Sequence, residues 1–465
     1  MGPLIRFLGV IFALSVILYV PSAYGAPFAY ITNAGDNTVS VIDTATNTVT
    51  ATVLGLGPNP QGVAVHPAGT SVYVINIGRS VPETTVSVID TAINTASTIL
   101  VGRYFRGVAV DPTGAVAYVT TLDAQNTVQI IDTVTNTVIG GISAGTGPLG
   151  PYGVAVHPQG TFLYAADING NKVSVINTAT AVATTVDLSP NLTPVSVAVE
   201  PKGTFVYVTN NDSNTVSVIA TSTNNVVATI PVGAGPIGVA VHPTKPFVYV
   251  TNSGHGTTRD VGSVNSNTVA VINTTTYAVS YVPVGVEPRG VSVHPNGMSV
   301  YVANESDDTV SVIDTNTNMV ISTIMVGDRP VAFGQFIANP SPIVAVAGLD
   351  QSVIEGAVVS LDGTASTGQH LTFKWEQLPG GPAVTLSNSA SAIPTFTAPL
   401  LLGGFGSQVL TFKLTVTSGG QSSAAVVNVT VINVNHAPDA HVGADQVVNE
   451  PQKSAKANVL GHASY

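Results

Sequence analysis

Residues 36–53 read DNTVSVIDTATNTVTATV, and nearly the same eighteen letters return three more times. The other copies are QNTVQIIDTVTNTVIGGI at 125–142, SNTVSVIATSTNNVVATI at 213–230 and DDTVSVIDTNTNMVISTI at 307–324. Each copy holds two apolar runs of strand-like composition around a polar turn, which predicts a β-hairpin. A hairpin that recurs over hundreds of residues indicates an architecture of repeated units.

A second phrase, GVAVHPAGT at 62–70, marks the period of these units. Related phrases begin at Gly107, Gly153, Ser196, Gly238 and Gly290, and a degenerate AFGQFI begins at Ala332. The spacings of 45, 46, 43, 42, 52 and 42 residues suit a β-propeller blade of four strands. GVAV predicts the innermost strand of a blade, VYVTN the second strand, TVSVID the third and VTATV the outer one.

The two ends of the repeats predict a closed ring. The chain enters on a second strand, FAYITN at 28–33, and the repeats end on an innermost strand, VAFGQFI at 331–337. Six complete units lie between, so a seventh blade takes its innermost strand from one end of the array and three strands from the other. We therefore predict an all-β fold with a seven-bladed β-propeller at residues 26–338.

The longest continuous copy, YVTNNDSNTVSVIATSTNNVVATIPVGAGPIGVAVHP at 207–243, resembles the YVTN-repeat β-propeller family, also described as surface-layer-type propellers. The resemblance covers about residues 28–338. It implies the propeller fold, and it leaves the function open between cell-surface proteins, binding modules and relatives of propeller enzymes.

Composition and the first residues bound the location of the protein. Arg6, the apolar run at 7–20 and the small residues Ala23 and Gly25 predict that residues 1–25 are a signal peptide, cleaved before Ala26. The apolar run is shorter than the ~20 residues of a membrane-spanning helix, and we expect no transmembrane segment in the mature chain. A net charge of −11 argues against nucleic-acid partners, and the absence of cysteine excludes disulfides. We expect a secreted, periplasmic or cell-surface protein.

A different all-β pattern occupies residues 339–435. AGLDQSVIEGAVVSLDGTAS at 347–366, FKWEQ at 373–377 and LTFKLTVTSGG at 410–420 resemble an Ig-like domain of the polycystic-kidney-disease (PKD) type, found as spacers and adhesion modules. We expect about seven short strands in a β-sandwich with Trp375 in its core. Residues 436–465 restart this pattern and lose it at once, which indicates a truncated second sandwich.

Histidine recurs at the turn after the innermost strand. Four units carry it, at His66, His157, His242 and His294, while two others carry Asp111 and Glu200. The shared property of these side chains is an acceptor that can begin a turn, so we expect a structural role. Equivalent positions on different blades also lie too far apart to share one ion. We therefore predict no metal site and no other cofactor.

Arginine points to a candidate site. Propeller topology places all six arginines of the mature chain on one face: Arg79, Arg103, Arg106, Arg259, Arg289 and Arg329. Arg106 and Arg289 directly precede innermost strands, as Gln61 and Tyr152 do in other units, so these four should surround the mouth of the central channel.

Guanidinium groups bind carboxylates and phosphates through a fixed fork of donors. The mouth, with Arg103 and Arg329 nearby, is thus the candidate site for a partner protein, a glycan or a small anionic ligand. The sequence leaves an alternative open, in which the arginines pair with local acids such as Glu287, Asp328 or the ESDD loop at 305–308.

One unit carries a long insertion on the same face, NSGHGTTRDVGSVNSN at 252–267, with His255, Arg259 and Asp260 inside it. It predicts either a lid or a tolerated surface loop. No catalytic motif is recognisable, and no catalytic residue is predicted. We expect an exported binding or structural protein that uses its propeller as an interaction platform. The alternative is a propeller enzyme of the lactonase or quinoprotein type that acts at the same mouth.

Overall fold

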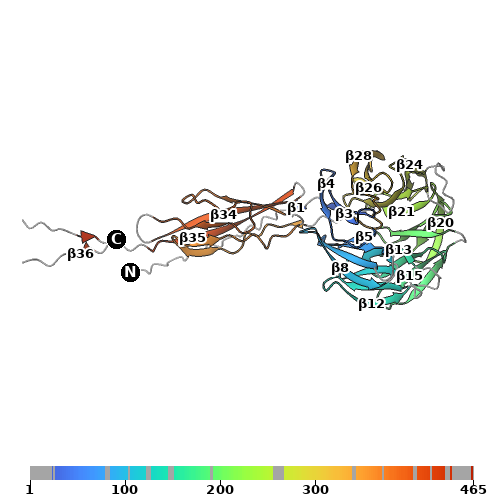
Figure 1. Cartoon of the computed structure of the whole chain (residues 1–465), viewed down its shortest axis with the longest axis horizontal. Coiled ribbons are helices and arrows are strands. Elements are labelled where there is room, and N and C mark those ends of the chain that lie inside the picture. The colour runs from blue at the N-terminus through green and yellow to red at the C-terminus, as the bar shows by residue number, and fades with distance from the viewer. Residues whose placement is uncertain are drawn as a thin grey trace, which may run out of the picture.

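The computed structural model describes residues 27–78, 84–102, 105–121, 127–144, 151–188, 192–254, 266–337, 342–368, 371–401, 406–418 and 421–434, with 23–24, 440–441 and 462–463. These residues form strands, bridges and turns, and they contain no helix long and apolar enough to cross a membrane. A ring of small sheets is followed along the chain by a sandwich (Figure 1). The predicted all-β class is confirmed.

Six sheets of four antiparallel strands repeat one order from the axis outward. The innermost strands are β5 (Pro60–Val65), β9 (Phe105–Val110), β13 (Pro151–Val156), β17 (Pro194–Val199), β21 (Pro236–Val241) and β25 (Pro288–Val293). The second strands are β6 (Ser71–Asn76), β10 (Val116–Thr121), β14 (Phe162–Asp167), β18 (Phe205–Asn210), β22 (Phe247–Asn252) and β26 (Ser299–Asn304). The third strands are β7 (Thr84–Asp90), β11 (Thr127–Asp132), β15 (Lys172–Asn177), β19 (Thr215–Ala220), β23 (Thr268–Asn273) and β27 (Thr309–Asp314). The outer strands are β8 (Thr95–Gly102), β12 (Thr137–Ser143), β16 (Ala183–Asp187), β20 (Asn225–Pro231), β24 (Val279–Pro283) and β28 (Met319–Met325).

The seventh sheet closes the ring. Its three strands are β2 (Phe28–Asn33), β3 (Thr38–Asp43) and β4 (Thr48–Val53), and residues 331–337, here called the closing segment, lie on the inner side of β2. The amide of Tyr30 donates to the carbonyl of Phe336, and the amide of Val331 donates to the carbonyl of Thr32, both at 2.9 Å. The predicted seven-bladed propeller with a split blade is therefore confirmed.

A tyrosine recurs on the second strand of each blade and packs between neighbouring blades. This tyrosine is buried in the apolar layer between blades. The hydroxyl of Tyr73 donates to Asn136 Oδ1 in the outer turn of the following blade at 3.1 Å, and that of Tyr301 donates to Asn47 Oδ1 at 2.6 Å. The repeated letters therefore place the same buried ring between successive blades, and in these two blades the ring also forms a hydrogen bond to the next blade.

Glycine is the third residue of most innermost strands because neighbouring strands crowd together near the axis. A Cβ atom on Gly107 would lie 2.4 Å from the carbonyl oxygen of Tyr152. A Cβ atom on Gly290 would lie only 1.9 Å from the carbonyl oxygen of Ala332 in the closing segment. Backbone atoms cannot yield as a flexible side chain can, so a larger residue at Gly290 would disturb the ring closure.

The sandwich consists of six strands in the described part of residues 351–432. They are β30 (Gln351–Ile354), β31 (Val358–Ser360), β32 (Thr372–Gln377), β33 (Thr395–Thr397), β34 (Ser407–Ser418) and β35 (Gln421–Ile432). One sheet has the order β30–β35–β34–β32, and β31 pairs with β33. About seven strands were expected, but residues 383–394 form turns and bends. Trp375 is 2% exposed and lies in the core, as predicted.

The chain ends lie largely outside the described residues. Of the predicted signal peptide, only β1 (Ala23–Tyr24) is described, and it pairs with β29 (Pro342–Ile343) beside the sandwich. Of residues 436–465, only β36 (Ala440–His441) and β37 (His462–Ala463) are described. The signal peptide and the truncated second sandwich therefore stay predictions.

Candidate functional site

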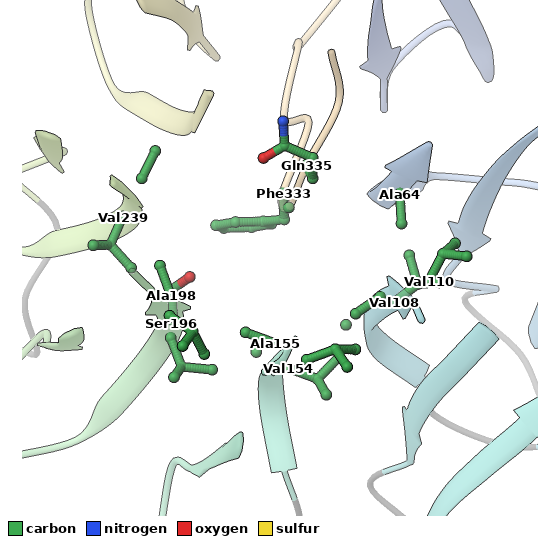
Figure 2. Close-up of a pocket in the computed structure, with 18 of the residues that line it drawn as sticks. Ala64, Val108, Val110, Val154, Ala155, Ser196, Ala198, Val239, Phe333 and Gln335 are labelled. Atoms are coloured by element: carbon green, nitrogen blue, oxygen red, sulfur yellow. The ribbon is translucent and has the colours of Figure 1, made fainter. Parts of the chain in front are cut away.

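The innermost strands enclose a cavity of about 530 Å³ on the axis of the ring. Valine, alanine, glycine and proline supply most of its lining, and Figure 2 shows Val108, Val154 and Val239 around it. The ring of Phe333 extends into the cavity from the closing segment (Figure 2). Among the described residues, the polar side chains of the lining belong to His66, Arg106, Tyr152, Ser196 and Gln335.

Three of the predicted mouth residues form one cluster. Arg106 Nη1 donates to Gln61 Oε1 at 3.2 Å, and the guanidinium carbon of Arg106 lies 5.3 Å from the centre of the Tyr152 ring. The Tyr152 ring in turn meets the ring of Phe333 edge-on, with 6.1 Å between their centres. Cation–π and edge-to-face contacts of this kind hold the guanidinium in place, and among the described residues its one hydrogen-bond partner is Gln61.

Threonines of the second strands position this cluster. Thr120 Oγ1 accepts from the amide of Gly107 at 2.9 Å and donates to the carbonyl of Tyr152 at 2.9 Å. Thr32 Oγ1 donates to the carbonyl of Gln61 at 3.0 Å. Each threonine therefore ties the backbone of one mouth residue to a second strand of the preceding blade, which fixes the strands that carry Gln61, Arg106 and Tyr152.

Two of the other predicted arginines are paired with one carboxylate. Arg289 Nε lies 2.5 Å from Glu305 Oε2, and Arg329 Nη2 lies 2.6 Å from Glu305 Oε1. The Glu305 side chain is 8% exposed. Burial alone would raise the pKa of Glu305, but the charges and hydrogen bonds of both arginines outweigh it and lower that pKa. For these two arginines the structure shows the acid pairing that the sequence left open, with the acid supplied by the ESDD loop.

Arg106 differs from this pair in its surroundings. In the described part of the chain no carboxylate lies within ion-pair distance of Arg106, and Arg289 is absent from the cavity lining. Arg106 is thus the cation that faces the cavity. The remaining predicted residues, Arg103 and the insertion residues His255, Arg259 and Asp260, lie outside the described residues.

The repeated histidines hold turns and blades together. His66 Nδ1 accepts from the amide of Ala68 at 3.1 Å, so the ring proton sits on Nε2, which donates to the carbonyl of Gly114 in the next blade at 3.0 Å. His157 and His242 repeat both contacts with glycine carbonyls, and His294 reaches Thr44 instead. Among the described residues, no three side chains of the metal-ligating types lie close enough to hold an ion. The histidines are structural.

Sequence reasoning missed Phe333 and Gln335 as cavity residues. Both come from the closing segment, in which Gly334 adopts a φ of 110°. That backbone shape lets the segment leave a regular strand, so its side chains reach the axis. The signal for this was the departure of AFGQFI from the GVAV pattern of the other units.

Comparison with known proteins supports the architecture. Residues 347–431 match a family model described as a PKD domain. No curated protein matches the chain.

Solved structures match the propeller part at low identity. Hydrazine synthase of Kuenenia stuttgartiensis is 23% identical with a TM-score of 0.53, over 66% of this chain and 99% of that one. The periplasmic gluconolactonase PpgL of Pseudomonas aeruginosa is 19% identical with a TM-score of 0.52, over 67% and 98%. A putative 6-phosphogluconolactonase of Bacteroides uniformis is 16% identical with a TM-score of 0.53, over 66% and 98%. At these identities the similarity shows the propeller fold alone.

Proposed function

We propose that this protein is an exported, non-enzymatic binding protein that takes an anionic ligand at the Arg106 mouth of its propeller. The observation that carries the proposal is the pairing pattern of the arginines. Glu305 forms ion pairs with both Arg289 and Arg329, whereas the partners of Arg106 among the described residues are the neutral side chains of Gln61 and Tyr152. A guanidinium held in this way favours a carboxylate or phosphate from outside the chain.

Two features of the sequence support a location outside the cytoplasm. Residues 1–25 have the composition of a signal peptide, and the PKD-type sandwich is suited to a spacer on an exported protein. One structural neighbour is itself described as periplasmic. The repeated YVTN motif supports a relation to the surface-layer-type repeats. A mature N-terminus at Ala26 in the extracellular, periplasmic or surface fraction of the host would support this assignment, and an uncleaved cytoplasmic chain would contradict it.

The competing function is hydrolysis of a lactone, because two of the similar structures carry lactonase names. Such a reaction needs a base or a metal ion beside the substrate. The described lining holds no carboxylate, and the one histidine in it, His66, uses both ring nitrogens in hydrogen bonds within the fold. The geometry around Arg106 therefore favours binding over catalysis.

The test compares the wild type with Arg106→Gln and with Arg329→Gln as a control on the same face. Each purified protein is incubated with host extract, and the retained small anions are measured by mass spectrometry. We expect at least one anion to be retained by the wild type and by R329Q and lost with R106Q. Equal retention by all three proteins would refute the proposal. Hydrolysis of glucono-δ-lactone that R106Q abolishes would establish the lactonase instead.

A further inference from the structure

The cavity has two chemically different ends. We propose that the ligand of this channel is an amphipathic monocarboxylate, with its carboxylate at Arg106 and its hydrocarbon chain extended along the axis. The inference rests on the proposed function and goes beyond it by naming the ligand class. It is carried by the charge, the polarity and the length of the channel.

The charge of the lining matches one negative charge. Arg106 is the only lysine or arginine among the described lining residues, and no acidic side chain accompanies it. His66 is engaged within the fold at both ring nitrogens, by the amide of Ala68 and the carbonyl of Gly114. A dianion such as a phosphate ester would leave one charge without a partner in the channel, which is costly at a buried site. A carboxylate matches the planar fork of a single guanidinium.

The end of the channel opposite Arg106 is a collar of prolines. Each complete blade places the proline of its first turn there, at Pro67, Pro112, Pro158, Pro201, Pro243 and Pro295. Proline has no amide N–H to donate, and its side chain is an apolar ring. The donors of His66, which also lies at this end, are already engaged by the fold. A charged or polar group would gain no hydrogen-bond donor from these side chains, whereas a hydrocarbon tail would bury apolar surface against them.

Between the two ends the side chains are aliphatic. Figure 2 shows Val108, Val154, Ala155 and Val239 along the walls. The hydroxyl of Ser196 and the amide of Gln335 are the polar side-chain groups there. A sugar acid would have to place several hydroxyl groups against these walls, and hydroxyl groups that lose water without gaining partners weaken binding.

The dimensions of the channel suit one extended chain. An innermost strand of six residues, such as β9, advances about 20 Å. The cavity of about 530 Å³ is lined from Arg106 to the prolines, and the rings of Phe333 and Tyr152 flank its mouth. A linear chain can pass the aromatic rings and reach the prolines, so affinity should grow with chain length.

The experiment titrates the full mature chain with butyrate, octanoate and dodecanoate, with octanol as a neutral probe and gluconate as a hydrophilic anion, by isothermal titration calorimetry. Each methylene that leaves water should raise affinity by up to about fourfold, so octanoate should bind at least about tenfold more tightly than butyrate. Octanol and gluconate should both bind more weakly than octanoate.

Variants test the contributions of the carboxylate and of the hydrocarbon chain separately. Arg106→Gln should lower the affinity for octanoate by about tenfold or more, because a charged hydrogen bond is lost, while Arg329→Gln should leave it unchanged. Ser196→Leu should weaken dodecanoate more than butyrate, and Ser196→Gly, the residue found in other blades, should not. Circular dichroism confirms that each variant is folded.

The outcomes distinguish the two proposals. Gluconate or butyrate that binds as tightly as octanoate, with loss in R106Q, would overturn the amphipathic ligand and leave the anion site intact. Octanol that binds as tightly as octanoate, unaffected by R106Q, would overturn both. Absence of any binding by these carboxylates would overturn the ligand class, and the extract experiment then decides the anion site by itself.

Discussion

Ring closure can be tested at Gly290. A Cβ atom there would lie 1.9 Å from the carbonyl oxygen of Ala332, and the amide of Gly290 donates to the carbonyl of Val331 at 2.9 Å. Gly290→Ala therefore drives a methyl group into the backbone of the closing segment. Overpacking against atoms that cannot rotate away costs up to about 3 kcal/mol. For a unit of this size, that cost lowers the midpoint of thermal unfolding by about 6 °C.

The chain contains its own reporters for this measurement. Every tyrosine lies outside residues 339–435, and the only tryptophan, Trp375, lies in the sandwich core. Tyrosine emission therefore follows unfolding of the propeller, and tryptophan emission follows unfolding of the sandwich. We expect G290A to lower the midpoint seen by tyrosine and to leave the midpoint seen by tryptophan in place.

Gly140→Ala is the matched control. Gly140 is exposed on the outer strand β12, and a Cβ atom there would meet nothing within 4 Å. G140A should change the free energy of unfolding by no more than an ordinary surface substitution does, about 0.5 kcal/mol. An unchanged tyrosine midpoint in G290A, or an equal loss in G140A, would refute the close approach of the closing segment to β25.

Three further predictions concern side chains that join blades. Glu305→Gln removes the carboxylate between two arginines and should lower propeller stability by about 1–3 kcal/mol in urea unfolding; no loss would mean that the ion pairs contribute nothing. Tyr301→Phe should cost about 1 kcal/mol, whereas Tyr249→Phe should cost less, since the hydroxyl of Tyr249 has no partner among the described residues; equal losses would contradict the fastening role. Burial lowers the pKa of His242 and His294 below 6.5, so the unfolded chain binds protons first on acidification. The midpoint of propeller unfolding should therefore decrease as the pH is lowered from about 7 to about 5, and it should not change with pH above 7. A midpoint that rises on acidification would contradict this prediction.

Much of the fold could be predicted because the repeat encodes it many times. Each copy of the phrase, such as those at Gly107 and Gly153, locates an innermost strand. The first and last copies locate the point where the ring closes, here called the seam. The cluster of Gln61, Arg106 and Tyr152 followed from the same register, because equivalent positions in a ring must meet at the axis. Periodicity therefore locates residues that share a position on the blade.

Periodicity does not determine which partners side chains choose. Glu305, Arg289 and Arg329 lie on the predicted face, but their pairing depends on the directions of three long side chains across the seam. The sequence named several acids as possible partners and could not select one. The consequence is chemical, since Glu305 engages two arginines and Arg106 is left as the cation of the described cavity lining.

The seam also explains why the cavity has an aromatic wall. In a regular blade the innermost strand is pressed between two neighbours, so small residues such as Gly107 are required near the axis. The closing segment escapes this requirement, because it contacts β2 and β5 through isolated bridges and turns at Gly334. It can therefore bring Phe333 to the mouth beside Tyr152 without disturbing the repeat. The unit that departs most from the repeat is thus the one whose side chains can vary at the cavity, and substitutions there can change the shape of the proposed ligand site while the other six blades keep the ring closed.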